Sequence, residues 1–129
     1  MQLSATHVDG LRFVVTAEQH ALLVDAPESE GGTGTGMNSR QLFAASEAAC
    51  ILSFVANSLQ LRGLPMRKLS LEMDYEQAKR PQRISQLDMR ILVDPPVPEE
   101  MHRAILAVAE RSILPNTLRH PPDVYVSLA

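Results

Sequence analysis

Cys50 is the residue whose type and setting best suit covalent chemistry in this sequence. It is the only cysteine among 129 residues, so an internal disulfide is impossible and the thiol is either inert or reactive. A free cysteine usually packs as a small buried hydrophobe, whereas its thiolate form is a nucleophile. The chemistry of this chain therefore depends on where Cys50 lies.

Polar residues recur at helical spacing around Cys50. At intervals of three and four residues the cysteine aligns with Ser46, Ser53, Asn57 and Gln60. Residues at these intervals share one face of a helix, and this is the only polar stripe on an otherwise apolar segment. We expect the thiol to face this solvated stripe and regard Cys50 as the candidate nucleophile.

A glycine-rich run at 31–36 resembles a phosphate-binding loop in composition only. A P-loop requires Lys and then Ser or Thr after its last glycine, but Met37 and Asn38 stand there. The run also lies several residues beyond Asp25, whereas a dinucleotide fingerprint follows its strand directly. We therefore expect neither nucleotide binding nor any other cofactor.

Histidine and serine offer no better site. No histidine pairs with a cysteine or with another histidine at metal-ligand spacing, so we expect no metal site. The sequence also lacks the G-x-S-x-G elbow of many serine hydrolases. The histidines, which we interpret as solvated or capping residues, are His7, His20, His102 and His120.

The first elements that would position Cys50 are three short strands and a loop. The strands are predicted at 2–8, 11–16 and 21–25 as an antiparallel meander. Residues 26–37 have no apolar periodicity, which predicts a mobile loop. Asn38 and Gln41 then form a capping box that predicts a helix over 39–61, ended by Gly63 and Pro65.

Alternating and helical patterns continue after this long helix. The spacing predicts strands at 68–76 and 84–93, a helix from 98 to 112, a turn at 116–122 and a closing strand at 124–128. The order lacks regular alternation of strand and helix, which indicates an α+β fold with antiparallel sheets and a long central buried helix. We predict a single domain over 1–129.

Composition narrows the class of protein. Hydrophobic residues make up 45% of the chain, enough for one core, and the net charge of -3 comes without a basic run. No stretch approaches the roughly 20 apolar residues that cross a bilayer. We expect a soluble cytoplasmic protein that binds neither nucleic acid nor membrane.

Two segments resemble motifs of the OsmC/Ohr family, the osmotically inducible and organic hydroperoxide resistance proteins. Residues 38–50 (NSRQLFAASEAAC) are similar to the family segment N-P-E-Q-L-F-A-A-x-x-A-A-C. Residues 109–118 (AERSILPNTL) resemble, in degraded form, its second motif A-E-x-C-P-V-x-N-T-L. The order of strands and helices agrees over nearly the whole chain.

The resemblance implies an intertwined homodimer with its two central helices buried at the centre and two sites at the subunit interface. A long helix that is apolar on most sides is also hard to bury in one small chain. In active members a cysteine attacks the O–O bond of an organic hydroperoxide, becomes a sulfenic acid, and condenses with a second cysteine. Cys50 matches the first of these positions.

The sequence departs from the family pattern at two further positions. Ser112 stands where the second cysteine would be, and a hydroxyl is not expected to resolve a sulfenic acid into a disulfide. Arg40 replaces the glutamate thought to orient a family arginine, for which Arg12 is the nearest but unassigned candidate. Arg40 also lies ten residues before Cys50, roughly 15 Å along a helix, so any help to a thiolate must come across the dimer or from a bent-back side chain.

Two functions follow from this pattern. The chain is either a one-cysteine peroxidase that reduces hydrophobic hydroperoxides with an external thiol as reductant, in oxidative stress defence, or an inactive dimer of the same fold. The inactive dimer would hold a small hydrophobic ligand in an apolar interfacial pocket. Both hypotheses expect a homodimer, and they differ in whether Cys50 reacts.

Overall fold

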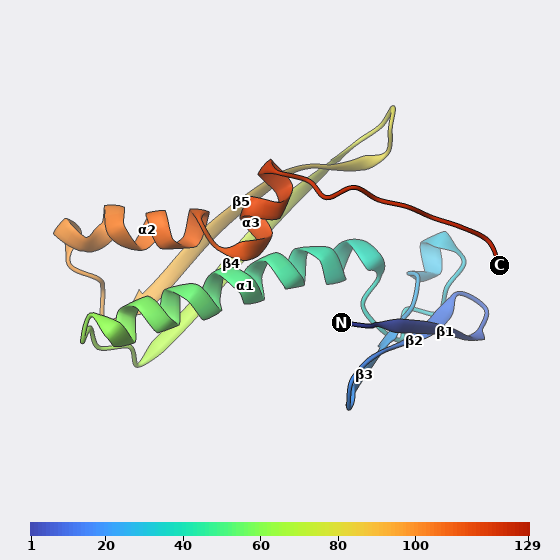
Figure 1. Ribbon diagram of the computed structural model, residues 1–129, viewed down its shortest axis with the longest axis horizontal. Helices are drawn as coiled ribbons and strands as arrows, with labels where there is room; N and C mark the ends of the chain where they lie inside the picture. The colour runs from blue at the N-terminus through green and yellow to red at the C-terminus, as the bar shows by residue number, and fades with distance from the viewer. The chain divides into compact units, whose positions relative to one another are not determined.

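The computed structural model describes residues 1–129, which form two compact units, Met1–Ala45 and Ser46–Ala129 (Figure 1). The first unit contains the antiparallel sheet β1 (Ser4–Asp9), β2 (Arg12–Ala17) and β3 (His20–Val24), paired in the order β1-β2-β3. These strands confirm the predicted meander to within two residues at each end.

Asp25 organises the segment after β3. Its side chain is 2% exposed, and its carboxylate accepts hydrogen bonds from the backbone N–H of Thr33 (3.2 Å) and Thr35 (3.0 Å) and from both hydroxyls (2.5 and 2.8 Å). These donors hold the pKa of Asp25 well below its usual range. A Cβ on Gly32 would overlap the Ala26 carbonyl. The segment predicted as a mobile loop is thus a hydrogen-bonded turn, which includes a 3₁₀ turn at Glu28–Glu30.

The long helix α1 (Ser39–Leu61) begins at the predicted capping box and ends as expected. Asn38 Oδ1 accepts the Gln41 N–H at 2.9 Å, and the Asn38 N–H donates to Gln41 Oε1 at 3.0 Å. Gly63 has a φ of 65°, and the Leu64 N–H bonds the Leu59 carbonyl at 2.9 Å, so glycine permits the left-handed residue that closes the helix.

By length and composition, α1 is also the one helix able to cross a membrane, with a mean hydropathy of 1.5 over 18 residues. The expectation that no segment approaches this limit was therefore wrong. The core helix of a water-soluble protein meets the same criterion, so the observation is weak evidence for a membrane span.

The second unit is built on a long antiparallel ribbon of β4 (Lys68–Ala78) and β5 (Arg83–Asp94). One face of this ribbon carries the partly buried side chains Leu69, Leu71, Met89, Ile91 and Val93, as the alternation in the sequence predicts. They pack against Ile51, Val55 and Leu59 of α1 and against Ile105 and Ala109. This cluster is the core of the unit, and β4 and β5 have no third strand beside them.

The chain after β5 differs from the prediction. A 3₁₀ turn (Glu99–Met101) leads into α2 (His102–Glu110), and a separate helix, α3 (Ile113–Arg119), replaces the turn expected at 116–122. Pro115 lies in the first turn of α3, where the missing N–H costs no hydrogen bond within the helix. Residues 124–128 form no strand within the chain (Figure 1). The side chains of Val124, Tyr125, Val126 and Leu128 are all at least 77% exposed.

Candidate functional site around Cys50

Cys50 lies in the middle of α1 with its thiol free and its side chain half-buried. Its Sγ accepts a hydrogen bond from the backbone N–H of Leu114, at an N···S distance of 3.4 Å. The thiol is therefore neither sealed in the core nor fully solvated. An N–H donor at sulfur can stabilise negative charge there, which suits a nucleophile.

The N–H that reaches Cys50 belongs to the first turn of α3. The opening N–H groups of a helix have no acceptor within the helix itself. Leu114 is the second residue of α3, so its N–H is free to bond the sulfur. The short turn between α2 and α3 thus places a backbone donor against the thiol, a feature that the predicted continuous helix over 98–112 did not contain.

Ser112 occupies that turn rather than the helix face on which it was predicted. It is the residue immediately before α3 and is 0% exposed. Its hydroxyl donates to the Ala109 carbonyl at 2.7 Å, and its own carbonyl accepts the Asn116 N–H at 3.1 Å. Ser112 therefore lies two residues before Leu114, whose N–H donates to Cys50. The Ser112 hydroxyl is already bonded to the Ala109 carbonyl.

The polar stripe of α1 faces solvent, as predicted. Ser46, Ser53, Asn57 and Gln60 are all exposed, and the Ser53 hydroxyl donates to the Ala49 carbonyl at 2.8 Å. None of the four lines the two cavities described below. The stripe supplies access to the thiol side of α1 but does not form a pocket within the single chain.

Both arginines that the sequence singled out are paired inside the unit Met1–Ala45. Arg40 Nη2 lies 2.7 Å from Glu30 Oε1, across the turn that Asp25 organises. Arg12 bonds Asp9 through two nitrogens at 2.6 Å. A role for Arg40 at Cys50 stays a prediction, and the role of the family arginine is not assigned to Arg12.

Glu47 was not predicted from the sequence as a residue of the site. It stands three residues before Cys50 on α1, is 2% exposed, and has no hydrogen-bond partner at Oε2. Burial raises the pKa of this carboxyl above its usual range. Its spacing in the sequence could have indicated that it is buried, because Glu47 lies on the same face of the helix as Ala44, Ile51 and Val55. These three residues are all buried.

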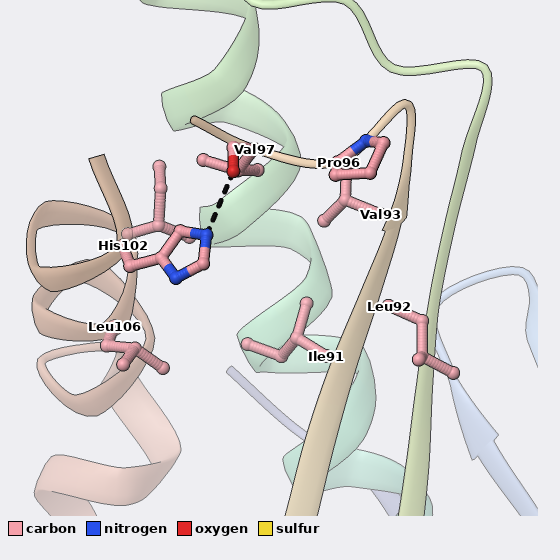
Figure 2. A pocket seen from close by; sticks show the side chains of 8 residues that line it. Ile91, Leu92, Val93, Pro96, Val97, His102 and Leu106 are labelled. Atoms are coloured by element: carbon pink, nitrogen blue, oxygen red, sulfur yellow. Dashed lines mark hydrogen bonds between the residues drawn. The ribbon is translucent and has the colours of Figure 1, made fainter. Parts of the chain in front are cut away.

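Several cavities lie in the second unit, and two of them lie between β5 and α2. One, of about 310 Å³, is bounded by β5, the following loop and α2 (Figure 2). Its walls are apolar, and His102 Nε2 bonds the Val97 carbonyl at 2.9 Å beside it. The other cavity has a volume of about 330 Å³ and is lined in part by Ile51, which follows Cys50, and by Pro115, which follows Leu114. Its charged side chains are Asp88, Glu110 and Arg119.

Two of the four histidines behave as capping residues. The ring nitrogens of His7 and His102 each bond a nearby backbone carbonyl, at 2.9 Å in both cases. No group of three or more His, Cys, Asp or Glu side chains is placed to hold a metal ion.

Comparison with known protein families identifies the family of this chain. The model of the OsmC-like protein family matches residues 32–127, which include Cys50, α3 and the whole ribbon between them. The chain belongs to this family. The assignment confirms the resemblance carried by 38–50 and 109–118, and with it the α+β fold of antiparallel sheets around a long helix.

Solved structures agree with the OsmC-like fold. A Psychrobacter arcticus 273-4 protein, provisionally described as an osmotic stress induced and detoxification response protein, is 18% identical with a TM-score of 0.84, covering 91% of this chain and 87% of its own. An OsmC like protein from Mycoplasma pneumoniae is 17% identical (TM-score 0.76; 93% and 87% covered). An organic hydroperoxide resistance protein OsmC from Legionella pneumophila is 22% identical (TM-score 0.66; 92% and 88% covered). A search of curated proteins found no significant match.

Proposed function

We propose that this OsmC-like protein is a one-cysteine thiol peroxidase that reduces organic hydroperoxides in the cytoplasm. The observation that carries the proposal is the hydrogen bond from the Leu114 N–H to Cys50 Sγ, which places a donor against the sulfur of a half-buried thiol. The Legionella pneumophila relative, an organic hydroperoxide resistance protein, supports the choice of substrate.

The proposed reaction needs one cysteine and one external reductant. The Cys50 thiolate attacks the terminal oxygen of the hydroperoxide, the O–O bond breaks, and the products are a sulfenic acid and an alkoxide, which takes up a proton to leave as an alcohol. The chain holds no second cysteine, and the Ser112 hydroxyl cannot form a disulfide. A dithiol from outside must therefore reduce the sulfenic acid, releasing water and forming a disulfide within the reductant.

We also propose that the active form is a homodimer. Phe54 and Leu61 of α1 are 37% and 80% exposed in the single chain, and both lie at helical spacing from Cys50. The ribbon of β4 and β5 has two open edges, and a two-stranded ribbon is marginal without further cover. A second copy would cover these surfaces and enclose the thiol in an interfacial pocket.

Trapping of the sulfenic acid tests the enzymatic proposal. Wild-type protein treated with cumene hydroperoxide should give a dimedone adduct at Cys50 and should consume hydroperoxide continuously when dithiothreitol is in excess. Cys50→Ser should abolish both while keeping the circular dichroism spectrum and the oligomeric state. Absence of both adduct and turnover in folded wild-type protein would mean that Cys50 is not peroxidatic.

A matched pair of variants tests Arg40. Arg40→Ala and Glu30→Ala break the same 2.7 Å ion pair, but only the first removes a positive charge from the helix start. If Arg40 assists Cys50, the rate of Cys50 oxidation should fall in Arg40→Ala and hold in Glu30→Ala. Equal rates of Cys50 oxidation in the two variants would show that Arg40 only stabilises the turn.

The apolar cavity beside His102 favours a second candidate function, the binding of a small hydrophobic ligand without turnover. Its volume of about 310 Å³ is at the lower end of ligand pockets, and its lining is almost wholly apolar. Binding of a fluorescent fatty acid to Cys50→Ser, lost on Leu106→Lys, would support this function if wild-type protein shows no peroxidase activity.

A further inference from the structure

Glu47 is a buried carboxylic acid on α1. Its side chain is 2% exposed, Oε2 is sealed from solvent, and that oxygen has no hydrogen-bond partner. No ion pair reaches it, because the four salt bridges of the chain involve other residues. Asp88, Glu110 and Arg119, the charged side chains of the cavity that includes Ile51, do not pair with Glu47 Oε2 either.

An unpartnered buried carboxyl costs folding free energy, so its presence calls for an explanation. The nearest buried positions of its stripe on α1, Ala44, Ile51 and Val55, are apolar, and a leucine or methionine at 47 would join them at no such cost. Burial favours the neutral acid by raising its pKa. Glu47 is thus a group that retains a proton to higher pH than an exposed glutamate does.

The place of Glu47 relates it to the thiol. Residues three apart on a helix have Cβ atoms about 5–6 Å from one another. Cys50 is three residues after Glu47 on α1, and its Sγ meets the first turn of α3. A small substrate oxygen at the sulfur would therefore lie within reach of the Glu47 side chain after a rotamer change.

We propose that Glu47 is the proton donor to the leaving alkoxide when Cys50 cleaves an alkyl hydroperoxide. The inference rests on the peroxidase proposed above. The sulfur loses two electrons and gains an S–O bond to the terminal OH, the O–O bond breaks, and the alkoxide takes the Glu47 proton to leave as an alcohol. Water then returns a proton to Glu47.

This assignment also specifies the substrate class. An alkoxide is a poor leaving group and needs a proton as the O–O bond breaks, whereas the carboxylate released from a peroxycarboxylic acid does not. General acid catalysis typically contributes roughly 10²–10⁴-fold to a rate. Glu47 should therefore matter for alkyl hydroperoxides and be dispensable for peroxyacids.

Stopped-flow oxidation of reduced protein compares the two classes. Glu47→Gln should lower the rate constant of Cys50 oxidation by tert-butyl hydroperoxide by roughly a hundredfold, the lower end of the contribution of a general acid. The rate constant with peracetic acid should be little changed. Glu47→Asp, which keeps an acid, should recover part of the lost rate, and the exposed Glu100→Gln should behave as wild type.

The outcomes separate the two proposals. Equal losses with both oxidants in Glu47→Gln, or no loss with either, would overturn the assignment of Glu47 while Cys50 remains peroxidatic. Wild-type protein that reacts with neither oxidant would instead reject the proposed function. Thermal unfolding of each variant, measured in parallel, shows that the proteins compared are folded.

Discussion

The backbone N–H of Leu114 donates to Cys50 Sγ across 64 residues of sequence, at 3.4 Å. This contact joins the middle of α1 to the first turn of α3. A chemical change at the sulfur should therefore alter the chemical shift of the Leu114 amide, which is bonded to it.

The first prediction uses that amide. In a ¹H–¹⁵N correlation spectrum, Cys50→Ala should move the Leu114 resonance further than those of most other amides, since the variant removes its acceptor. Ser53→Ala, which changes a hydroxyl bonded to the Ala49 carbonyl, is the matched control and should leave Leu114 in place. An unmoved Leu114 amide in Cys50→Ala would contradict the hydrogen bond.

The second prediction concerns the resolving position. Ser112 is fully buried and lies two residues before Leu114, so Ser112→Cys should place a second thiol near Cys50. A disulfide requires Cα atoms no more than roughly 7 Å apart. Mild oxidation should remove both free thiols of this variant as measured by thiol titration, without forming covalent dimers. Ser112→Cys in a Cys50→Ser background controls for oxidation of the new cysteine alone.

The third prediction addresses assembly. Phe54→Glu places a charge on the exposed apolar face of α1, where we propose that a second copy binds. The dimer dissociation constant should rise at least tenfold, about 1.4 kcal/mol, by analytical ultracentrifugation. Gln60→Glu, on the exposed polar stripe, should leave it unchanged. A monodisperse wild-type monomer at micromolar concentration would remove the dimer from the proposal.

The local patterns of the sequence specified most of the fold. The Asn38 and Gln41 capping box, the alternation in β4 and β5 and the glycine at position 63 each act over a few residues, and each appears in the structure as predicted. The order of strands and helices indicated the α+β class, and the family motif at 38–50 added the OsmC-like fold. These features depend on short-range chemistry, which single-sequence patterns record well.

The candidate site was less predictable because it depends on tertiary contacts. The sequence predicted a helix to residue 112 and a turn at 116–122, but a separate helix, α3, begins at Ile113, so the N–H donor to Cys50 was missed. Glu47 was one polar residue among apolar ones, and only packing shows that its carboxyl is buried without a partner. Asp25 likewise gains its donors from Thr33 and Thr35, eight and ten residues later.

The fourth prediction follows from the lowered pKa of Asp25. Its folded pKa lies below the unfolded value of 3.8, because the Thr33 hydroxyl and the Thr35 N–H bond the carboxylate. The stabilisation is therefore complete well above pH 3.8 and is lost as pH falls toward the folded pKa. Asp25→Asn should lower the free energy of unfolding in urea more at pH 7 than at pH 3. Equal losses at the two pH values would contradict an ionised Asp25.

The fifth prediction has the opposite sign and concerns Glu47. Desolvation raises its folded pKa above the reference value of 4.5, so the unfolded chain ionises first as pH increases. The native state then binds more protons than the unfolded state, and stability falls between pH 4.5 and the folded pKa. Glu47→Gln, which resembles the neutral acid in shape, should therefore raise the free energy of unfolding at pH 7 and change it little at pH 4. Urea unfolding of both proteins at the two pH values measures the difference, and Glu100→Gln supplies the exposed control. A variant less stable than wild type at pH 7 would show that Glu47 is ionised and paired in the native protein, which would also remove the basis for its role as a proton donor.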